Sequence, residues 1–354
     1  MTPKYQVLAG ELKKQIPVML REGMRKLPGE NELSKQYDCS RQTVRAALAA
    51  LAAEGVIVKR HGSGSYITES SALNSREIAL LVPDRNEYIY PHIIQDIRRA
   101  LSAKGYTLTC YDTDGRFLTE RSILSKLIED PPAGIIMEAI NNIIPCMNQA
   151  QLRQIDNAGI PLIYLHNAYS FPVGAVCIGQ DNLGGGYELV KYLYSKGHRN
   201  IAGIMRSDVK SGIERYSGCV QASLDLGLDF QESSYFWYSA ESRKRLLEND
   251  DTALKYYIQG LLISNTAIIC YNDEIAYRLI RVMQKNNISV PGTMAVASFD
   301  NSYYCTAGDI GITSLGHAPN SIGKCAAEAI LSLAAGKRAR STDLPWTLNE
   351  RASS

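Results

Sequence analysis

The feature that most constrains the fold is an alternation of short apolar runs with amphipathic helical segments from residue 77 onward. Apolar runs of four or five residues, separated by helices, predict strands of parallel α/β sheets that are covered on both faces. About 270 residues of this alternation are enough for two similar lobes, with a ligand cleft at the carboxyl ends of the strands. The runs are 78–82, 107–111, 134–137, 162–165 and 201–204, and the predicted helices include 93–103 and 121–129.

Chain length and charge distribution point to a second, smaller domain. The chain has 354 residues, more than the roughly 250–300 at which a single core stops growing. Residues 1–70 contain 11 Lys and Arg against 7 Asp and Glu, whereas the remaining 284 contain 27 against 29. A small basic segment on a near-neutral body is typical of a nucleic-acid-binding module joined to another domain, although such an excess is also common on solvated surfaces.

The cysteines and the apolar runs indicate the cellular compartment. The eight cysteines are widely spaced and form no CxxC pair, which favours neither a zinc site nor a disulfide framework. No apolar run reaches the roughly 18 residues of a membrane span, and the first residues show no basic segment followed by an apolar core. We therefore expect a cytoplasmic chain with reduced thiols, no metal and no membrane contact.

The first 67 residues predict three helices followed by a two-stranded wing. Pro28 suits the first turn of the second helix, and Ser40 is a strong N-cap for the third helix, which Gly55 ends. Pro17 is expected to kink or end the first helix. The predicted helices are 5–20, 28–37 and 41–54, and the predicted strands are 56–58 and 65–67. This order is that of a winged helix-turn-helix.

The third predicted helix presents side chains suited to reading DNA. Arg41, Gln42, Thr43 and Arg45 lie in its first two turns, on the face opposite its apolar residues. An Arg fork can bond guanine N7 and O6, and Gln can bond adenine N6 and N7, in the major groove. Helix-turn-helix proteins place the first residues of this helix against base edges. The alternative is that the two arginines are solvated charges at ordinary i, i+4 spacing.

The wing turn carries a second basic group, Lys59, Arg60 and His61, which is placed to contact phosphates or a neighbouring groove. The run LPGENELSKQYDCSRQTVRAALAALAAEGVIVKRHGSGSYI resembles the DNA-binding domain of the GntR family of bacterial regulators, over nearly all of residues 3–68. The resemblance implies DNA contacts from the start of the third helix and from the wing around Gly62. Family members often carry Arg where this chain has Asn31.

The rest of the chain resembles the sensor domain of the LacI/GalR repressors. Matching stretches include IALLVPDRNEYIYPHIIQDI, GIERYSGCVQASLDLGL and AIICYNDEIAYRLIRVMQKNNISVPGTMAVASFDNS, and the match covers almost all of residues 77–337. The resemblance implies an α/β two-lobed, periplasmic-binding-protein-like (type I) sensor domain with an N-terminal winged helix-turn-helix domain. The expected divisions are a head at 1–69, a linker at 70–76 and a sensor at 77–354, with lobe 1 at about 77–178 and 301–330 and lobe 2 at about 183–298 and 340–354.

The ends of the predicted strands supply candidate ligand-binding residues. A sugar offers hydroxyls in pairs, so its site needs groups that donate and accept in pairs. Arg215 resembles the arginine that holds ligand hydroxyls in this family. Asn272 and Asp273 follow one strand and Asp300 ends another; Asp273 is placed to bridge two hydroxyls, and Asp300 suits a structural role equally well. The other candidates are Tyr88, Tyr90, His92, Glu138, His166 and Asn167, and for each the alternative is a solvated loop residue or a helix cap.

A GntR-type head on a LacI-type sensor is an unusual pairing, and it resembles the arabinose-responsive repressors. That resemblance implies a homodimer that binds double-stranded operator DNA and is released by a small sugar effector, L-arabinose. Three alternatives stay open: the same architecture answering to another sugar or to a nucleoside, an activator, and a sugar-binding protein without a regulatory role.

An enzyme is not indicated, because the sequence shows no catalytic constellation, no P-loop and no cofactor motif. Gly184-Gly185-Gly186 lacks the GxGxxG spacing of a dinucleotide site. These three glycines fit close packing at the boundary between the lobes instead. No cofactor is therefore expected.

Overall fold

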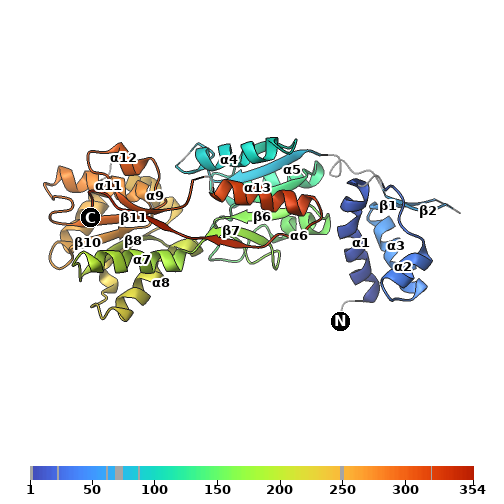
Figure 1. Cartoon of the computed structure of the whole chain (residues 1–354), viewed down its shortest axis with the longest axis horizontal. Coiled ribbons are helices and arrows are strands. Elements are labelled where there is room, and N and C mark those ends of the chain that lie inside the picture. The colour runs from blue at the N-terminus through green and yellow to red at the C-terminus, as the bar shows by residue number, and fades with distance from the viewer. Residues whose placement is uncertain are drawn as a thin grey trace.

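The computed structural model describes residues 3–21, 24–60, 63–67, 75–86, 88–247, 251–319 and 321–354. A small head and the two lobes of a sensor follow one another along an elongated molecule (Figure 1). The fold is an α/β two-lobed sensor with an N-terminal winged helix-turn-helix, as the sequence predicts. Within these described ranges, every helix is too short or too polar to cross a membrane.

The head packs three helices and a wing around one apolar core. The elements are α1 (Lys4–Arg21), α2 (Glu30–Gln36), α3 (Arg41–Ala53), β1 (Ile57–Arg60) and β2 (Gly64–Ile67). Ser40 Oγ accepts a hydrogen bond from Thr43 N (3.1 Å), so the predicted N-cap of α3 is confirmed. Of the kink or end expected at Pro17, the end does not occur, because α1 runs on to Arg21. The helix continues because Leu12 and Ile16 are buried in the core, and this packing outweighs one lost backbone hydrogen bond.

The first lobe is a six-stranded parallel sheet with helices on both faces. Its strand order is β13-β7-β6-β5-β3-β4. Helices α4 and α13 cover one face and α5 and α6 the other (Figure 1). The strands are β3 (Glu77–Val82), β4 (Thr107–Asp112), β5 (Gly134–Met137), β6 (Leu162–Leu165), β7 (Val176–Gln180) and β13 (Thr342–Leu344). The helices are α4 (Tyr90–Ser102), α5 (Phe117–Glu129), α6 (Gln149–Asn157) and α13 (Ser321–Ala334).

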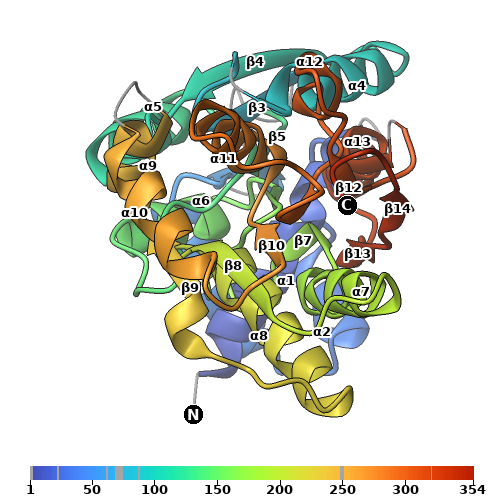
Figure 2. The same ribbon diagram turned by 90° about the vertical axis from the view of Figure 1, so that its left-hand side faces the viewer.

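The second lobe repeats this arrangement, with strand order β14-β12-β11-β10-β8-β9 and only the β12–β14 pair antiparallel. Helices α7 and α8 cover one face and α9, α10 and α11 the other (Figure 2). The strands are β8 (Ile201–Arg206), β9 (Tyr235–Tyr238), β10 (Ala267–Cys270), β11 (Ala295–Phe299), β12 (Thr313–Gly316) and β14 (Thr347–Asn349). The helices are α7 (Asn182–Ser195), α8 (Lys210–Asp225), the 3₁₀ turn η2 (Glu232–Ser234), α9 (Ala240–Leu247), α10 (Thr252–Leu261), α11 (Asp273–Lys285) and α12 (Tyr304–Ala307).

The chain crosses between the lobes after β7, after β12 and between β13 and β14. The three crossing segments are bonded to one another. Trp346 Nε1 donates to Asp181 O (2.7 Å), and His317 Nδ1 donates to Pro345 O (3.0 Å). Three linked segments at one edge form a hinge about which the lobes can open and close.

The expected division between the lobes is wrong at two short strands and at α12, which was expected in lobe 1 but packs in the lobe 2 core through Cys305. β12, expected in lobe 1, pairs with β11 in the lobe 2 sheet, and β13, expected in lobe 2, pairs with β7 in lobe 1. A strand this short pairs with the sheet edge that lies next to the crossing segment. The apolar pattern of its own residues does not indicate which sheet that is. Of the expected linker, residues 70–74 lie outside the described residues.

The three consecutive glycines lie where α7 meets α8 and the hinge. A Cβ on Gly186 would lie 2.0 Å from Arg215 O, and one on Gly185 would lie 2.5 Å from Trp346 Nε1. A side chain at Gly186 would therefore push α7 away from α8, and one at Gly185 would push α7 away from Trp346 in the hinge. The expectation that these glycines serve close packing at the lobe boundary is confirmed.

Candidate ligand cleft and nucleic-acid interface

The start of α3 presents polar side chains to solvent. Arg41, Gln42 and Arg45 are exposed, whereas Val44 and Leu48 are buried in the head core. Helix α1 lies between the sensor and the rest of the head, so α3 and the wing are on the far side of α1 (Figure 1). This arrangement leaves the predicted reading face of α3 accessible to a partner as large as a DNA duplex.

Two of the predicted DNA-binding side chains have partners within the head. Thr43 Oγ1 is 2.9 Å from Ser40 Oγ and so takes part in the helix cap. Arg45 Nε donates to Glu30 Oε2 (2.7 Å) of α2. Both side chains of that ion pair are at least a third exposed, so the pair is weak and a phosphate can replace the carboxylate.

The wing differs from the prediction in that residues 25–27, before α2, pair with β2 through an isolated bridge. Lys59 and Arg60 are exposed on β1, whereas His61 and Gly62 lie outside the described residues. Leu27 N donates to Ser65 O (2.9 Å), and Lys26 forms an isolated β-bridge with Tyr66. Lys26 is not among the predicted residues, because a bridge of single residues produces no strand periodicity.

Glu138 lies at the carboxyl end of β5, at the edge of lobe 1 that approaches Arg206 and Tyr271 of lobe 2. It follows β5, and its Oε2 accepts from Tyr90 OH (2.8 Å) while its Oε1 accepts from Asn167 Nδ2 (3.1 Å). Burial, and then the charge of Glu138, raise the pKa of Tyr90 well above its ordinary value, so its hydroxyl stays protonated. Tyr90 and His92 lie in the first turn of α4 rather than in the predicted loop. The structure thus brings together three side chains that the sequence nominated separately.

A contact across the cleft joins lobe 1 to lobe 2. Tyr88 OH donates to Asp300 Oδ2 (2.8 Å) and accepts from Asp273 N (3.3 Å). Tyr88 has φ 57° and Asp300 has φ 95°, a left-handed conformation that costs such residues about 1–3 kcal/mol each. Strained residues at two facing strand ends indicate a place where the fold is shaped for binding rather than for stability alone.

Arg215 of α8 links the cleft to the hinge. Its side chain is buried, and its Nη2 lies 3.3 Å from Asp300 Oδ1. Its Nε donates to Asn182 Oδ1 (3.0 Å), and its Nη1 donates to Tyr271 O. The guanidinium also lies over the Phe299 ring, 4.2 Å from the centroid. Arg215 therefore orients Asp300 and holds the start of α7 against α8.

The side chains of Asp273 and Asn272 form hydrogen bonds within lobe 2 and stabilise that lobe, rather than pointing toward a ligand. The Asp273 carboxylate is fully buried and accepts from Ser298 Oγ, Ser314 Oγ (2.6 Å) and Ser302 N (2.6 Å). Burial, and then the charge of Asp300, raise its pKa to about 6. Asn272 Oδ1 caps α11 by accepting from Ile275 N (3.1 Å). With these oxygens occupied, the expected bridge from Asp273 to two ligand hydroxyls does not fit the structure.

A cavity of about 200 Å³ lies between the lobes beside Asp300. Residues of both lobes line it, including Tyr88, His92, Ser302, His317 and Ser321. His317 Nδ1 donates to a carbonyl, so the neutral ring carries an acceptor at Nε2, and burial lowers its pKa. His317 Nε2, Ser302 Oγ and Ser321 Oγ are buried and have no hydrogen-bond partner among the described residues.

Leaving such an atom unpaired costs about 1–3 kcal/mol, so a hydroxyl-bearing ligand in this cavity would recover that loss. His166, another predicted site residue, has φ 57° and a buried Nε2 that also lacks a partner. These buried, unpaired atoms make His317, Ser302 and Ser321 candidates to bond the hydroxyl groups of a ligand.

Two cleft residues were missed by the sequence analysis. Arg206 ends β8 and faces Tyr90 across the cleft, where its positive charge opposes the increase in the pKa of Tyr90. Tyr271 follows β10, and its hydroxyl lies 3.0 Å from Ser211 Oγ. Both lie at the carboxyl ends of parallel strands, the same position that indicated Glu138 as a candidate.

Two family models match separate parts of the chain. Residues 4–67 match the model described as "Bacterial regulatory proteins, gntR family". Residues 190–354 match that of a periplasmic binding protein-like domain. These are the head and the C-terminal half of the sensor, in the order that the sequence resemblances imply.

The chain is similar to curated relatives over nearly its whole length. It is 29% identical over 342 residues to an arabinose metabolism transcriptional repressor of Halalkalibacterium halodurans, covering 94% of this chain and 89% of that protein. It is 28% identical over 334 residues to the repressor of the same name from Geobacillus stearothermophilus, covering 94% and 91%.

Solved structures share the fold at lower identity. A LacI-type regulator from Alkaliphilus metalliredigens, complexed with D-xylulofuranose, superposes with a TM-score of 0.66 at 22% identity, covering 79% of this chain and 99% of that one. The regulator CelR with cellobiose gives a TM-score of 0.70 at 20% identity, covering 93% and 100%. The relatives are transcriptional regulators rather than enzymes. The chain accordingly carries a head that matches the gntR-family model and a periplasmic-binding-protein-like domain, and it is similar over nearly its whole length to transcriptional repressors.

Proposed function

We propose that this chain is a repressor of sugar-utilisation genes and that L-arabinose, bound between the lobes, releases it from its operator. The observation that carries the proposal is the cleft itself. Side chains of both lobes line the cavity, and His317 Nε2 there is buried with no hydrogen-bond partner among the described residues; Tyr88 and Glu138 add polar groups at the facing edges of the lobes. A ligand that bonds to both walls favours the closed arrangement of the lobes.

The charges of the cleft favour an uncharged ligand. Arg206 is paired with Asp208 (2.7 Å), and Arg215 is paired with Asp300 (3.3 Å). A phosphorylated or acidic sugar would have to displace a carboxylate from one of these arginines, because anions bind where a cation is available to them. A neutral polyol needs only hydroxyl partners, and Glu138 and His317 supply acceptors for them.

The choice of L-arabinose is supported by the names of the two curated relatives, both arabinose metabolism repressors. The solved structures of the same fold hold D-xylulofuranose and cellobiose. Another pentose, a larger sugar or a nucleoside is therefore the second candidate effector, since the same cleft architecture accommodates different sugars.

The proposed mechanism transmits lobe closure to the heads of a homodimer. Besides Tyr88 with Asp300, the lobes meet where Asn142 Oδ1 accepts from Lys210 N (2.8 Å) at the start of α8. Arg41, Gln42, Thr43 and Arg45 of each head would read one half-site, with the wing on the phosphates. Ligand binding then shifts the dimer toward a head spacing that no longer fits the operator, which lies in the cytoplasm with the rest of the bacterial DNA.

Calorimetric titration with L-arabinose, D-xylose, D-ribose, D-galactose and uridine tests the proposal. We expect L-arabinose to bind most tightly, and Glu138→Gln to weaken that binding at least ten-fold, because the amide replaces a charged acceptor with a neutral one. A gel-shift assay in parallel should show that L-arabinose frees DNA from the wild-type chain. Tight binding of a different compound would reassign the effector, and binding of none would remove the sensing role.

A further inference from the structure

One segment of lobe 1 runs from the edge that faces lobe 2 to the edge that faces the head. β6 and β7 are parallel neighbours, with Ile163 opposite Val176, so the chain between them must return along the length of the sheet. Residues 166–175 make this return in turns and irregular structure rather than in a helix. The two ends of these residues, here called the return segment, therefore lie at opposite edges of lobe 1.

The end of the return segment near lobe 2 is bonded to the loop that carries Glu138. Asn167 Nδ2 donates to Glu138 Oε1 (3.1 Å). Ala168 O accepts from Asn142 Nδ2 (3.1 Å), and Asn142 Oδ1 accepts from Lys210 N of lobe 2 (2.8 Å). A ligand bonded at Glu138, or a movement of lobe 2, therefore acts directly on this end of the segment.

A buried polar cluster holds the middle of the return segment. Tyr169 OH accepts from Ile140 N (2.9 Å) and is bonded to the Glu120 carboxylate (3.1 Å). Both side chains of this second bond are buried. Tyr164 OH of β6 donates to Phe171 O. Because its middle is packed and bonded to neighbouring elements, a displacement of one end of the segment is transmitted along it.

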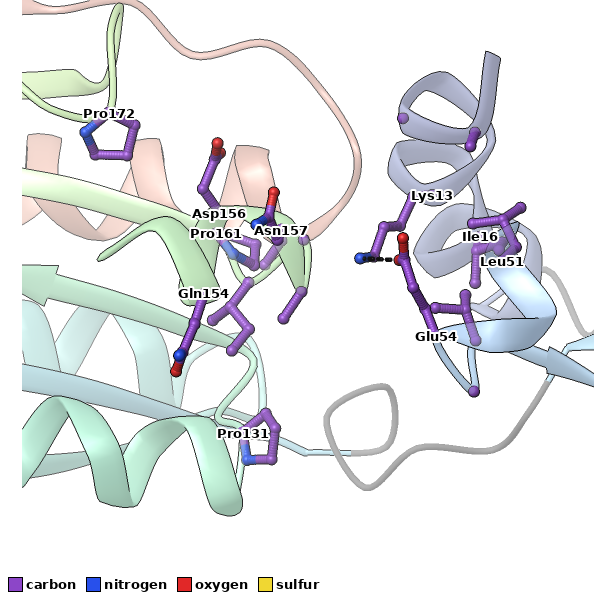
Figure 3. A pocket seen from close by; sticks show the side chains of 18 of the residues that line it. Lys13, Ile16, Leu51, Glu54, Pro131, Gln154, Asp156, Asn157, Pro161 and Pro172 are labelled. Atoms are coloured by element: carbon purple, nitrogen blue, oxygen red, sulfur yellow. Dashed lines mark hydrogen bonds and ion pairs between the residues drawn. The ribbon is translucent and has the colours of Figure 1, made fainter. Parts of the chain in front are cut away.

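The other end of the return segment faces the head across a groove of about 1530 Å³ between lobe 1 and α1. Phe171, Pro172 and Val173 line the wall formed by lobe 1, and Gly10 and Lys13 line the wall formed by α1. Figure 3 shows Pro172 and Lys13 on these opposite walls. Val173 is 92% exposed, so its apolar side chain makes few contacts in this arrangement of the domains.

Lobe 1 and the head already touch at this groove. A Cβ on Gly159, in the turn after α6, would lie 3.9 Å from Lys13 O of α1, which is van der Waals distance. Residues 158–161 of the same turn line the groove, so the contact and the groove are continuous. A rotation of the head about this contact would bring α1 onto Val173 and bury that side chain, which the hydrophobic effect favours.

We propose that the return segment couples the ligand to the head: a ligand bonded at Glu138 and Asn167 moves Phe171–Val173 onto α1, and this contact holds the head in an orientation that does not fit the operator. The groove is thus occupied by the tip of the segment and α1 of the same chain. The contact forms in the ligand-bound state and is absent from the operator-bound state. The inference rests on the proposed function in that a ligand between the lobes must regulate DNA binding.

Val173→Ser tests the contact in the full chain, with a duplex selected from a random-sequence pool by the wild-type chain as operator. Because Val173 is exposed, the unfolding midpoint should not change. The matched control is Ile263→Ser, which removes an apolar side chain of lobe 2 that is 88% exposed. Operator affinity is measured with and without saturating L-arabinose, and sugar affinity with and without operator.

Val173→Ser should reduce the loss of operator affinity on adding sugar by about three-fold, as expected for losing part of one buried apolar contact. Because the coupling is reciprocal, the sugar affinity of the DNA-free chain should fall by the same factor, and that of the operator complex should not change. Operator affinity without sugar should be that of the wild type. Ile263→Ser should change none of these quantities.

A double variant tests the same contact without any sugar. Gly10→Cys with Val173→Cys, joined by a short bis-maleimide, should hold α1 on the tip of the return segment. Its operator affinity should fall by about 5- to 150-fold, the range of ligand-driven coupling. Each single cysteine variant, treated with the same reagent, is the control and should bind the operator as the wild type does.

The outcomes distinguish this inference from the proposed function. The inference is overturned if Val173→Ser responds to sugar as the wild type does, if the two cysteines cannot be joined, or if the joined variant binds the operator normally. A sugar affinity that falls equally with and without operator would also overturn it, since the defect would then lie in the ligand site. If L-arabinose leaves wild-type operator affinity unchanged while the joined variant has lost affinity, the proposed effector fails and the contact stands.

Discussion

The two binding regions of this chain place charge in opposite settings. On the head, Arg41 and Arg60 are exposed and can reach a partner without rearranging the fold. In the cleft, the side chains of Arg215 and Asp300 are only 3% and 8% exposed and are paired with each other. An exposed charge contributes little to stability, whereas removing one partner of a buried pair leaves the other uncompensated. Variants of the head should therefore change DNA binding alone, and variants of the cleft should change both stability and ligand response.

The largest expected effect is that of Arg215→Met. Asp300 would keep its bond from Tyr88 but lose its buried counter-charge, so the free energy of unfolding should fall by about 3–5 kcal/mol. Denaturant unfolding measures this loss, and Arg41→Met on the head is the control, with an expected change below about 0.5 kcal/mol. Equal losses in the two variants would contradict the contrast between the regions.

A buried carboxylate behind the cleft should make stability depend on pH. Glu120 is fully buried in α5, accepts from Asn148 Nδ2 (2.7 Å) and bonds to Tyr169 OH, and burial raises its pKa from 4.5 to about 7. Because the folded state binds this proton more tightly, the group favours folding most below pH 4.5, and this contribution disappears as the pH rises through 7. Glu120→Gln should therefore be about 3 kcal/mol more stable than the wild type at pH 8 and equal to it near pH 4.5.

Unfolding curves for both proteins from pH 4.5 to 8 check this sign. The network also reaches the cleft, because Ile140 N, two residues after Glu138, donates to Tyr169 OH (2.9 Å). A difference in stability that does not vary with pH would show that Glu120 is ionised throughout.

On the head, Arg41→Ala should cost about 1–3 kcal/mol of binding to a selected operator, the range for one bidentate base contact. Its affinity for the sugar should be unchanged, because the cleft is in another domain. Gel shift gives the first quantity and calorimetry the second. A change in sugar affinity would show that substitutions on the head also affect ligand binding in the sensor.

The smallest expected effect is that of Glu30→Gln, which breaks the exposed pair with Arg45. The free energy of unfolding should change by less than about 0.5 kcal/mol. Thermal unfolding at low and high salt is the measurement. A larger loss would show that this exposed pair of the head contributes to stability as the buried Arg215–Asp300 pair does.

The same contrast explains how far the sequence could predict the molecule. Ser40 and the exposed side chains of α3 act where local sequence puts them, so the cap and the reading helix were predictable. Strands such as β5 were predictable from their continuous apolar runs. The three donors to Asp273 come from Ser298, Ser302 and Ser314, and no local pattern indicates that these will converge on one carboxylate.

Elements whose position depends on pairing with distant residues were also not predictable, because local sequence does not indicate the pairing partner. β12 and β13 were expected in the wrong lobes because a sheet edge, and not their own residues, decides where they pair. The bridge of Lys26 to Tyr66 joins residues 40 positions apart and has no periodicity to detect. The positions of most helices and strands could thus be predicted from local sequence. The hydrogen-bond partners of buried polar groups could be identified only from the structure.

The central claim is that a sugar between the lobes lowers the affinity of the head for DNA. The most direct test is an operator gel shift with and without saturating L-arabinose, for the wild type and for Glu138→Gln. A coupling of about 1–3 kcal/mol corresponds to a 5- to 150-fold loss of operator affinity in the wild type. We predict that loss in the wild type, and that Glu138→Gln needs at least ten times more sugar to reach half of it. Sugar binding detected by calorimetry without any change in operator affinity would contradict it.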